Sequence, residues 1–221
     1  MAAGAVIFDM DGVLADSEPV HLAAERAMLA EYGHHLTLAE KQPFVGLAND
    51  EIMQGLIDRF GIDATVEELA AAKAGYQRAL IPAMGGFPVT TELVRRLAAA
   101  SIPIAVASGS APWNIDASLA SVGLAGFFEV RVSAAEVPLG KPAPDVFLEA
   151  ARRLGVAPES CVVIEDAVPG LAAALAAGMR CVAIPTITEP LDPSFTQAHL
   201  LFPAGMASAD VDAIFDFIQG C

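Results

Sequence analysis

Short apolar runs that end abruptly in polar or turn-forming residues recur along the chain. Most of them lack a strict alternation of apolar and polar positions, which is typical of strands buried on both faces of a parallel sheet. These runs predict strands at residues 5–9, 102–108, 129–133, 161–166 and 180–185.

Helical patterns lie between the later strands, at residues 90–100, 111–123, 144–155 and 169–178. The last two begin with Pro and end with Gly, as helices commonly do. Because strands and helices alternate, residues 1–16 and 83–221 are predicted to form an α/β core with a doubly wound, Rossmann-like parallel sheet.

Residues 17–82 interrupt this alternation. They contain three helical candidates, at 17–33, 48–61 and 65–80, and no convincing strand. We therefore expect an α-helical domain inserted after the first strand, with a hinge near the Gly- and Pro-rich segment 82–88.

The composition excludes several classes of partner. The 221 residues carry a net charge of −15 with only 12 Lys and Arg side chains and no basic patch, so we expect neither a nucleic-acid nor a membrane partner. The N-terminal segment lacks the positive charge of a secretory signal, and the most apolar stretch, at 170–179, is too short to cross a bilayer. Three cysteines, which cannot all pair within the chain, fit a reduced, cytoplasmic setting, and we expect a monomer or a weak homodimer.

Candidates for chemistry are the residues that follow the predicted strands, because ligands of open α/β sheets bind at the carboxyl ends of the strands. One of these strand ends, in the sequence ASGS, precedes a helix start, where free backbone N–H groups favour an anion. Another candidate is a lysine held in an extended loop by the proline that follows it. The full set is Asp9, Asp11, Ser108, Gly109, Lys141, Glu165 and Asp166.

Four carboxylates at one sheet edge repel one another unless they are protonated or bridged by a cation. Oxygen ligands alone select a hard ion such as Mg²⁺, which commonly bridges to a substrate phosphate. With Lys141 and Ser108 on the other side, a dianionic phosphate finds compensating charge all round. We expect Asp9 to be the nucleophile that forms an aspartyl-phosphate and Asp11 to be the general acid/base.

Taken singly, each of these features is more often structural. An Asp-x-Asp pair before Gly is an ordinary turn, Ser-Gly-Ser is usually a helix cap, and a Lys before Pro is usually solvated. Their joint placement at predicted strand ends favours the chemical interpretation.

The segments FDMDGVLADS, ASGS, GKPAPD and IEDAVPG, in this order, resemble the four motifs of the haloacid dehalogenase-like hydrolase superfamily. The helical insert resembles that superfamily's α-helical cap. The residues of the motifs are similar to those of its β-phosphoglucomutase-like and sugar-phosphate phosphatase branch. The resemblance implies a cap that closes over substrate, and Ser108 and Lys141 as ligands of the transferring phosphoryl group. It also implies Mg²⁺ held by Asp9, the main-chain carbonyl of Asp11 and Asp166, with Glu165 as a further ligand or a neighbour.

In the helical domain, the resemblance makes His21, Gly46, Asn49 and Lys73 candidate substrate contacts. A histidine within a helix is more often a half-buried structural residue, and a lysine on the last cap helix is as often solvated. Mutases of this branch usually present a basic residue shortly after the Gly of the loop 44–52, where it holds a second phosphate. Here the sequence Leu-Ala-Asn follows that Gly, which argues against a mutase.

We therefore predict a Mg²⁺-dependent phosphatase of small phosphorylated metabolites, in particular sugar phosphates. A β-phosphoglucomutase or related sugar phosphomutase is the alternative. A dehalogenase is disfavoured because that branch lacks the second acidic residue that Asp11 supplies. A non-catalytic binding protein is disfavoured because it has no need of an acid/base.

Overall fold

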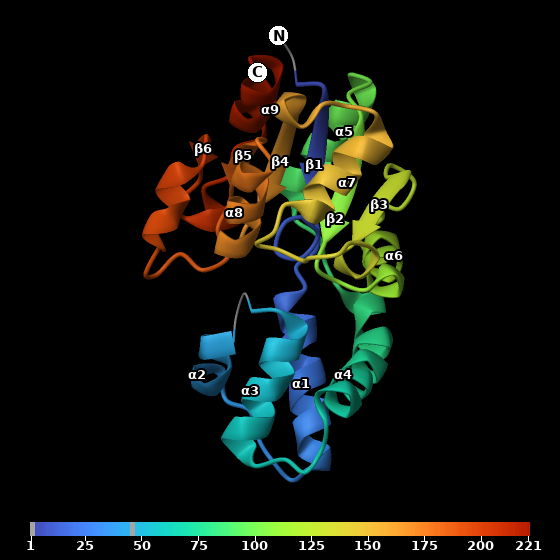
Figure 1. The fold of residues 1–221 in the computed structure, drawn as a ribbon, viewed down its shortest axis with the longest axis vertical. Coiled ribbons are helices and arrows are strands. Elements are labelled where there is room, and N and C mark those ends of the chain that lie inside the picture. The colour runs from blue at the N-terminus through green and yellow to red at the C-terminus, as the bar shows by residue number, and fades with distance from the viewer. Residues whose placement is uncertain (1–2, 45–46) are drawn as a thin grey trace. The chain divides into compact units, whose positions relative to one another are not determined.

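The computed structural model describes residues 3–44 and 47–221, and the chain divides into two compact units (Figure 1). The core unit comprises Met1–Asp16 and Gly85–Cys221, and the helical unit comprises Ser17–Met84. The sequence predicts boundaries after residues 16 and 82, so the second boundary of the compact units lies slightly further along the chain.

Within the described residues, six strands form one parallel sheet in the order β3-β2-β1-β4-β5-β6, and their labels run in that order from right to left in Figure 1. Central β1 pairs Phe8 with Val106 of β2 on one side and with Ile164 of β4 on the other. The residues that follow β1, β2 and β4 therefore meet at one edge of the sheet, where the strand order reverses. The strands are β1 (Ala5–Phe8), β2 (Ile104–Ser108), β3 (Val130–Ser133), β4 (Cys161–Glu165), β5 (Arg180–Ala183) and β6 (Leu200–Leu201).

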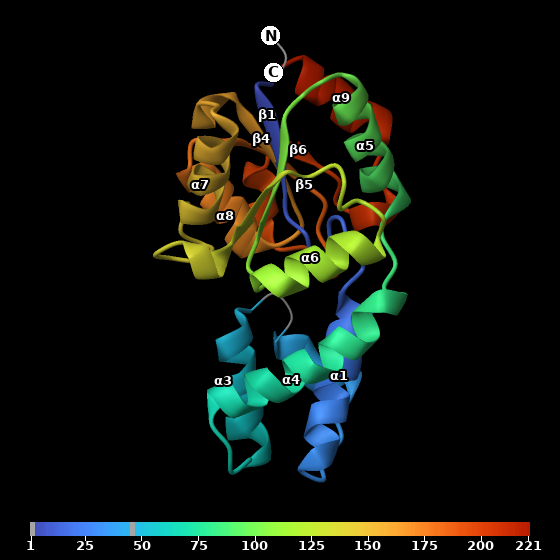
Figure 2. The same cartoon turned by 90° about the vertical axis from the view of Figure 1, so that its right-hand side faces the viewer.

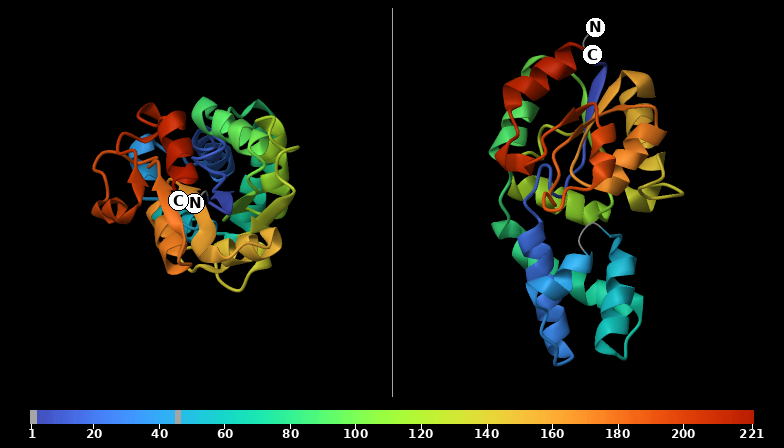
Figure 3. Two further views of the ribbon diagram at one scale, coloured as in Figure 1. Left: turned by 90° about the horizontal axis from the view of Figure 1, so that it is seen from above. Right: turned by 90° about the vertical axis from the view of Figure 1, so that its left-hand side faces the viewer.

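Helices cover both faces of this sheet, which is why every residue of β1, β2 and β4 is buried. On one face, α7 (Asp145–Leu154) contacts the first three strands and α8 (Val168–Ala176) contacts β4 and β5. On the other face, α5 (Pro88–Ala99) contacts β2 and packs against α9 (Val211–Gln219). Figure 2 and the right panel of Figure 3 show these two pairs of helices on opposite sides of the strands. The prediction of a doubly wound parallel sheet is thus confirmed.

Two elements of the core unit were not predicted. Strand β6 has only two residues, which is too short to produce a periodic signal. Helix α9 does carry a sequence signal, because Asp210 precedes an amphipathic run and Asp is a common N-cap residue. In the structure, the Asp210 side chain accepts the N–H groups of Asp212 and Ala213. The remaining core helix, α6 (Pro112–Ser121), contacts β3.

The helical unit contains four α-helices, and none of its described residues belongs to a strand. The Thr65 side chain accepts the N–H of Glu68, and the Glu68 carboxylate accepts the N–H of Thr65, which fixes the start of the last helix. The helices are α1 (Glu18–Glu31), α2 (Leu38–Lys41), α3 (Asn49–Phe60) and α4 (Val66–Leu80). The buried apolar residues between them are Met28, Leu29, Leu36, Ile52, Met53, Leu56, Ile62 and Leu69. Among the described residues of the whole chain, no helix combines the length and apolar character that crossing a bilayer requires.

Candidate active site

Lys141 joins the ends of two neighbouring strands. Its Nζ lies 2.8 Å from Asp9 Oδ1, just after β1, and 2.7 Å from Glu165 Oε1, the last residue of β4. The ammonium also stands 4.8 Å from the centre of the buried Phe147 ring of α7, a cation–π contact that orients it further. Residues far apart in the sequence are thereby drawn to one point on the sheet edge.

The second carboxylate oxygen of Glu165 is occupied by backbone groups. Oε2 accepts the N–H groups of Asp166 and Ala167, each at 2.7 Å, at the start of α8. Room for this side chain depends on Gly170, because a Cβ at that position would lie 1.6 Å from Glu165 Oε1. Glu165 therefore holds both Lys141 and the turn that carries Asp166.

Asp166 is held by the loop that follows β5. The Thr186 hydroxyl donates to Asp166 Oδ2, and the Thr186 N–H donates to the Asp166 carbonyl at 3.3 Å. Gly12, with φ at 72°, approaches from the turn after β1, and a Cβ there would lie 2.1 Å from Asp166 Oδ2. Only glycine tolerates both this backbone conformation and this close approach.

The charges of this cluster do not balance. Asp9, Glu165 and Asp166 each bring a carboxylate oxygen within 4.8 Å of one another, against the single ammonium of Lys141. Burial, followed by the neighbouring carboxylates Glu165 and Asp11, raises the pKa of Asp9 to about 7 although Lys141 opposes the shift. Burial and the same kind of repulsion raise the pKa of Asp166. Burial disfavours the charged form of Lys141, but Asp9 and Glu165 outweigh it and raise its pKa.

This donor set fits a hard cation. Three carboxylates each offer an oxygen atom within 4.8 Å of the others, and the lack of a side chain at Gly12 leaves room for Asp166 Oδ2 among them. An added positive charge would oppose the burial and the repulsion that raise the pKa of Asp9 and of Asp166. The acidic cluster can therefore hold a metal ion.

The side chain of Asp11 does not join that cluster but turns to the end of β2. Its Oδ2 accepts the Ser110 hydroxyl at 2.9 Å and lies 3.4 Å from the Ser108 hydroxyl. The buried Ser108 oxygen in turn accepts the Ser110 N–H at 3.0 Å. Between the two serines, Gly109 is exposed, and an added Cβ would meet nothing within 4 Å, so its predicted role rests on its backbone N–H alone.

The candidate contacts of the helical unit lie in another environment. His21 Nδ1 is 3.0 Å from Gln77 Nε2, while Gly46 lies outside the described residues. Lys73 is buried and donates to Glu25 Oε1 at 2.9 Å and to Asn49 Oδ1 at 3.2 Å. Whether any of these side chains contacts substrate stays a prediction.

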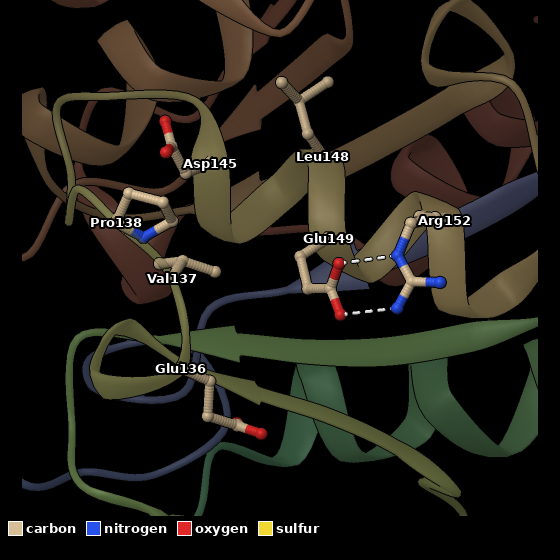
Figure 4. A pocket seen from close by; sticks show the side chains of 7 residues that line it. All are labelled: Glu136, Val137, Pro138, Asp145, Leu148, Glu149 and Arg152. Carbon is tan, nitrogen blue, oxygen red and sulfur yellow. Dashed lines mark hydrogen bonds and ion pairs between the residues drawn. The ribbon is translucent and has the colours of Figure 1, made fainter.

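A surface pocket of about 350 Å³ lies elsewhere on the core unit, and none of the predicted site residues lines it. Figure 4 shows Glu149 on α7 bound to Arg152 by two parallel hydrogen bonds, and Glu149 and Glu136 also pair with Arg153. Two arginines therefore offset two of the three carboxylates at this pocket, whereas one lysine faces three carboxylates at the sheet edge. Its lining residues are Glu136, Val137, Pro138, Asp145, Leu148, Glu149 and Arg152.

Sequence reasoning missed the residues that support the site. Ser110 lies within one of the four motifs, where only its place before a helix start was used and its side chain received no role, and Thr186 sits in a loop without any pattern. Asn114 left a signal that was not used, because it stands on the buried side of a helix together with Ser118, four residues on. Polar residues at that spacing on an apolar face mark a position with a specific partner.

Comparison with known proteins places the chain among hydrolases. A sequence model of the haloacid dehalogenase-like hydrolase family matches residues 3–178. Fructose-1-phosphate phosphatase YqaB of Escherichia coli is 38% identical over 80% of this chain and 94% of its own length. Protein SUPPRESSOR OF QUENCHING 1 of Arabidopsis thaliana is 39% identical over 82% of this chain, but the chain spans only 18% of that longer protein.

A solved structure shows the same fold. CbbY from Rhodobacter sphaeroides, crystallised in complex with phosphate, superposes with a TM-score of 0.82 at 26% identity, over 93% of this chain and 95% of the CbbY chain. The superposition covers nearly the whole of both chains, so the fold is shared throughout.

Proposed function

This chain belongs to the haloacid dehalogenase-like hydrolase family, and from that premise we propose that it hydrolyses small sugar phosphates with Mg²⁺ as its cofactor. Its enzyme class follows from the family and from relatives named as phosphatases: it is a phosphoric monoester hydrolase. The observation that carries the proposal is the unbalanced cluster at the sheet edge, where three carboxylates face one lysine.

We assign the nucleophile to Asp9, at the carboxyl end of the central strand. One of its carboxylate oxygens attacks phosphorus, and the bond between phosphorus and the ester oxygen breaks as an aspartyl-phosphate forms. Lys141, which contacts Asp9 at 2.8 Å, is placed to neutralise an oxygen of the transferring group. The Ser108 hydroxyl and the N–H groups around Gly109 supply hydrogen bonds to the remaining oxygens.

Asp11 supplies and removes the protons. In the first half of the reaction its carboxyl group gives a proton to the departing ester oxygen, which leaves as an alcohol. In the second half the resulting carboxylate takes a proton from water, and the water oxygen attacks phosphorus. The bond to Asp9 then breaks, and inorganic phosphate and the free Asp9 carboxylate are restored.

Asp9 and Asp166 are the carboxylates that we assign to Mg²⁺, together with the main-chain carbonyl of Asp11. When bound, Mg²⁺ supplies positive charge that offsets the negative charge of the phosphate and of the acidic cluster. Glu165 is assigned a different task, because both of its oxygens already accept hydrogen bonds from Lys141 and from backbone N–H groups. It fixes the lysine and the start of α8.

A panel of sugar phosphates tests the proposal. We expect phosphate release that requires Mg²⁺, a phosphoryl group on Asp9 detectable by mass spectrometry after acid quenching, and loss of both in Asp9→Asn. The matched control is Asp145→Asn, which removes a carboxylate from the surface pocket of Figure 4 and should leave the rate unchanged. Undiminished hydrolysis by Asp9→Asn would refute the assignment.

The sugar phosphomutase alternative requires a cation that holds a second phosphate. Lys73 is already bound to Glu25 and Asn49 within the helical unit, which favours hydrolysis over transfer. The discriminating measurement is the conversion of β-glucose 1-phosphate to the 6-phosphate in the presence of the bisphosphate. Conversion faster than phosphate release would establish the mutase instead.

A further inference from the structure

A line of polar side chains runs from the interior of α6 to the Asp11 carboxylate. The Ser118 hydroxyl lies 3.1 Å from Asn114 Oδ1, and Asn114 Nδ2 lies 3.3 Å from Ser110 Oγ. Ser110 Oγ then lies 2.9 Å from Asp11 Oδ2. Three links thus join a residue in the middle of a helix to the proposed acid/base.

Each link has a fixed direction. The Ser110 hydroxyl donates to Asp11 Oδ2, which can accept both in the ionised carboxylate and in a carboxyl group that carries its proton on Oδ1. The Ser110 oxygen is then free to accept from the Asn114 amide nitrogen, which turns the Asn114 oxygen toward the Ser118 hydroxyl. Hydrogen bonds aligned in one direction polarise one another, so the last bond of the line is stronger than an isolated one.

The burial of this line has a cost. Asn114 and Ser118 are buried, on the same helix as the buried Ile115 and Leu119. An apolar residue at either position would pack without the loss of hydration that a buried amide or hydroxyl suffers. The backbone of Ser110 is anchored as well, since the Ser133 hydroxyl at the end of β3 donates to its carbonyl at 2.7 Å. These buried polar side chains therefore lower the stability of the fold, and their effect is to orient the Ser110 hydroxyl.

We propose that Ser110, Asn114 and Ser118 are positioning residues that orient the Asp11 carboxyl group for proton transfer. This inference rests on the proposed function, in which Asp11 serves the leaving oxygen. Asp11 Oδ2 also lies 3.4 Å from the Ser108 hydroxyl, beside the place assigned to the phosphoryl group. Loss of the Ser110 bond removes the shorter of these two serine contacts, and the carboxyl group turns away from the ester.

Two substrates with different leaving groups distinguish a defect in proton transfer by Asp11 from a general defect of the site. An alkyl phosphate releases a strongly basic alkoxide that needs the Asp11 proton, whereas p-nitrophenyl phosphate releases an anion that needs none. A positioning defect at Asp11 therefore slows phosphorylation of Asp9 by an alkyl phosphate and leaves phosphorylation by p-nitrophenyl phosphate intact. A general disturbance of the site slows both.

The test compares Asn114→Ala and the milder Ser118→Ala with wild-type enzyme in rapid-quench experiments on both esters. We expect the alkyl-ester step to fall about tenfold, a part of the roughly 10²- to 10⁴-fold that general acid–base catalysis supplies. The nitrophenyl burst, the KM and the Mg²⁺ affinity should stay within about twofold. Ile115→Val, which trims a buried apolar neighbour on the same helix, is the control and should leave both steps unchanged.

A second comparison shows whether Asn114 acts through Asp11. In the Asp11→Asn background, adding Asn114→Ala should cause no further loss on the alkyl ester. Equal losses on the two esters, or the same loss with and without the Asp11 carboxyl group, would overturn the inference. The proposed function fails in a different way, by wild-type enzyme that hydrolyses neither ester or by an Asp11→Asn variant as fast as wild type on the alkyl ester.

Discussion

The two units of this molecule each bury a cluster of lysine and carboxylate side chains, and the two clusters have opposite charge balances. In the core unit, one ammonium, Lys141, faces the carboxylates of Asp9, Glu165 and Asp166. In the helical unit, the fully buried Glu25 faces two ammonium groups: Lys73 Nζ at 2.9 Å and Lys41 Nζ at 2.8 Å.

The helical cluster is nearly complete in itself. Burial alone would raise the pKa of Glu25, but Lys73 and Lys41 together hold it below its ordinary value. Glu18 approaches Lys41 to 3.9 Å and brings the local charge close to zero. Only Glu25 Oε2, which lies against Lys41, accepts no hydrogen bond from any described residue. Such a cluster stabilises one packing of helices and has no need of a ligand.

The core cluster keeps an excess of negative charge among its described residues. Burial and mutual repulsion raise the pKa of both Asp9 and Asp166, so the protein by itself does not stabilise the charges that it gathers there. The comparison teaches that burial of charge does not identify a functional site. An uncompensated charge is the feature that distinguishes the core cluster, and it is the reason for the metal site that we propose there.

The largest expected effect is on the folding of the helical unit. Glu25→Gln removes the carboxylate that contacts both buried ammonium groups and leaves only the more distant Glu18 near Lys41, so it should lower the free energy of unfolding by about 3–5 kcal/mol. Urea denaturation measures this change. The control is Glu18→Gln, whose half-exposed carboxylate should matter by less than about 1 kcal/mol. Equal small effects of the two substitutions would contradict the view that Glu25 organises this cluster.

Among substitutions of the buried lysines, Lys141→Met is expected to have the largest effect on catalysis. The lysine is the ammonium of the core cluster, and its loss should lower kcat/KM for a sugar phosphate by about 10²- to 10³-fold. Lys41→Met is the matched control, since it removes a buried lysine but leaves Glu25 paired with Lys73. Steady-state kinetics give kcat/KM for the two variants. Similar losses of kcat/KM in both would contradict the view that only the core cluster takes part in catalysis.

Addition of Mg²⁺ should stabilise the protein through the core cluster. At 100 times its dissociation constant, a ligand that binds only the folded state contributes about 2.7 kcal/mol, which calorimetry detects as a higher Tm. Asp166→Asn should abolish this rise, whereas Glu25→Gln should retain it from a lower starting Tm. A rise that survives in Asp166→Asn would place the ion elsewhere.

The smallest effect is a pH dependence confined to the helical cluster. Because the folded-state pKa of Glu25 lies below its ordinary 4.5, its stabilisation is fully present above that pH and is lost as the pH falls through the folded-state value. The stability difference between wild type and Glu25→Gln should therefore be constant near neutrality and shrink below pH 4.5. Urea titrations at several pH values measure this difference in the free energy of unfolding. A difference that stays constant below pH 4.5 would contradict the prediction.

Much of the core unit could be predicted from the sequence. Buried strands such as Ala5–Phe8 are recognisable in the sequence as short apolar runs. The polar residues that follow these runs are the ones that gather at the carboxyl edge of the sheet. The structure brings Asp9, Lys141, Glu165 and Asp166 together there, as their places at or near the ends of the predicted strands indicated. Their chemical roles follow from the proposed function and await its tests.

The cluster around Glu25 was beyond such reasoning. Glu25, Lys41 and Lys73 lie on three different helices, and on a sequence each looks like one more charge on an amphipathic surface. The same holds for Thr186, because its hydrogen bond to Asp166 depends on the conformation of the loop between β5 and β6. No periodic pattern records which charged side chain of one helix meets which of another.

The sequence by itself therefore determined the parallel sheet, the alternation of its helices and the set of polar residues at its edge, because hydrophobic periodicity and turn residues are local properties of the chain. The tertiary structure alone decided which charges are paired, which oxygen of Glu165 meets Lys141 and which serine holds Asp11. These depend on distances of a few ångströms between residues far apart in the sequence, and such distances exist only once the units have packed.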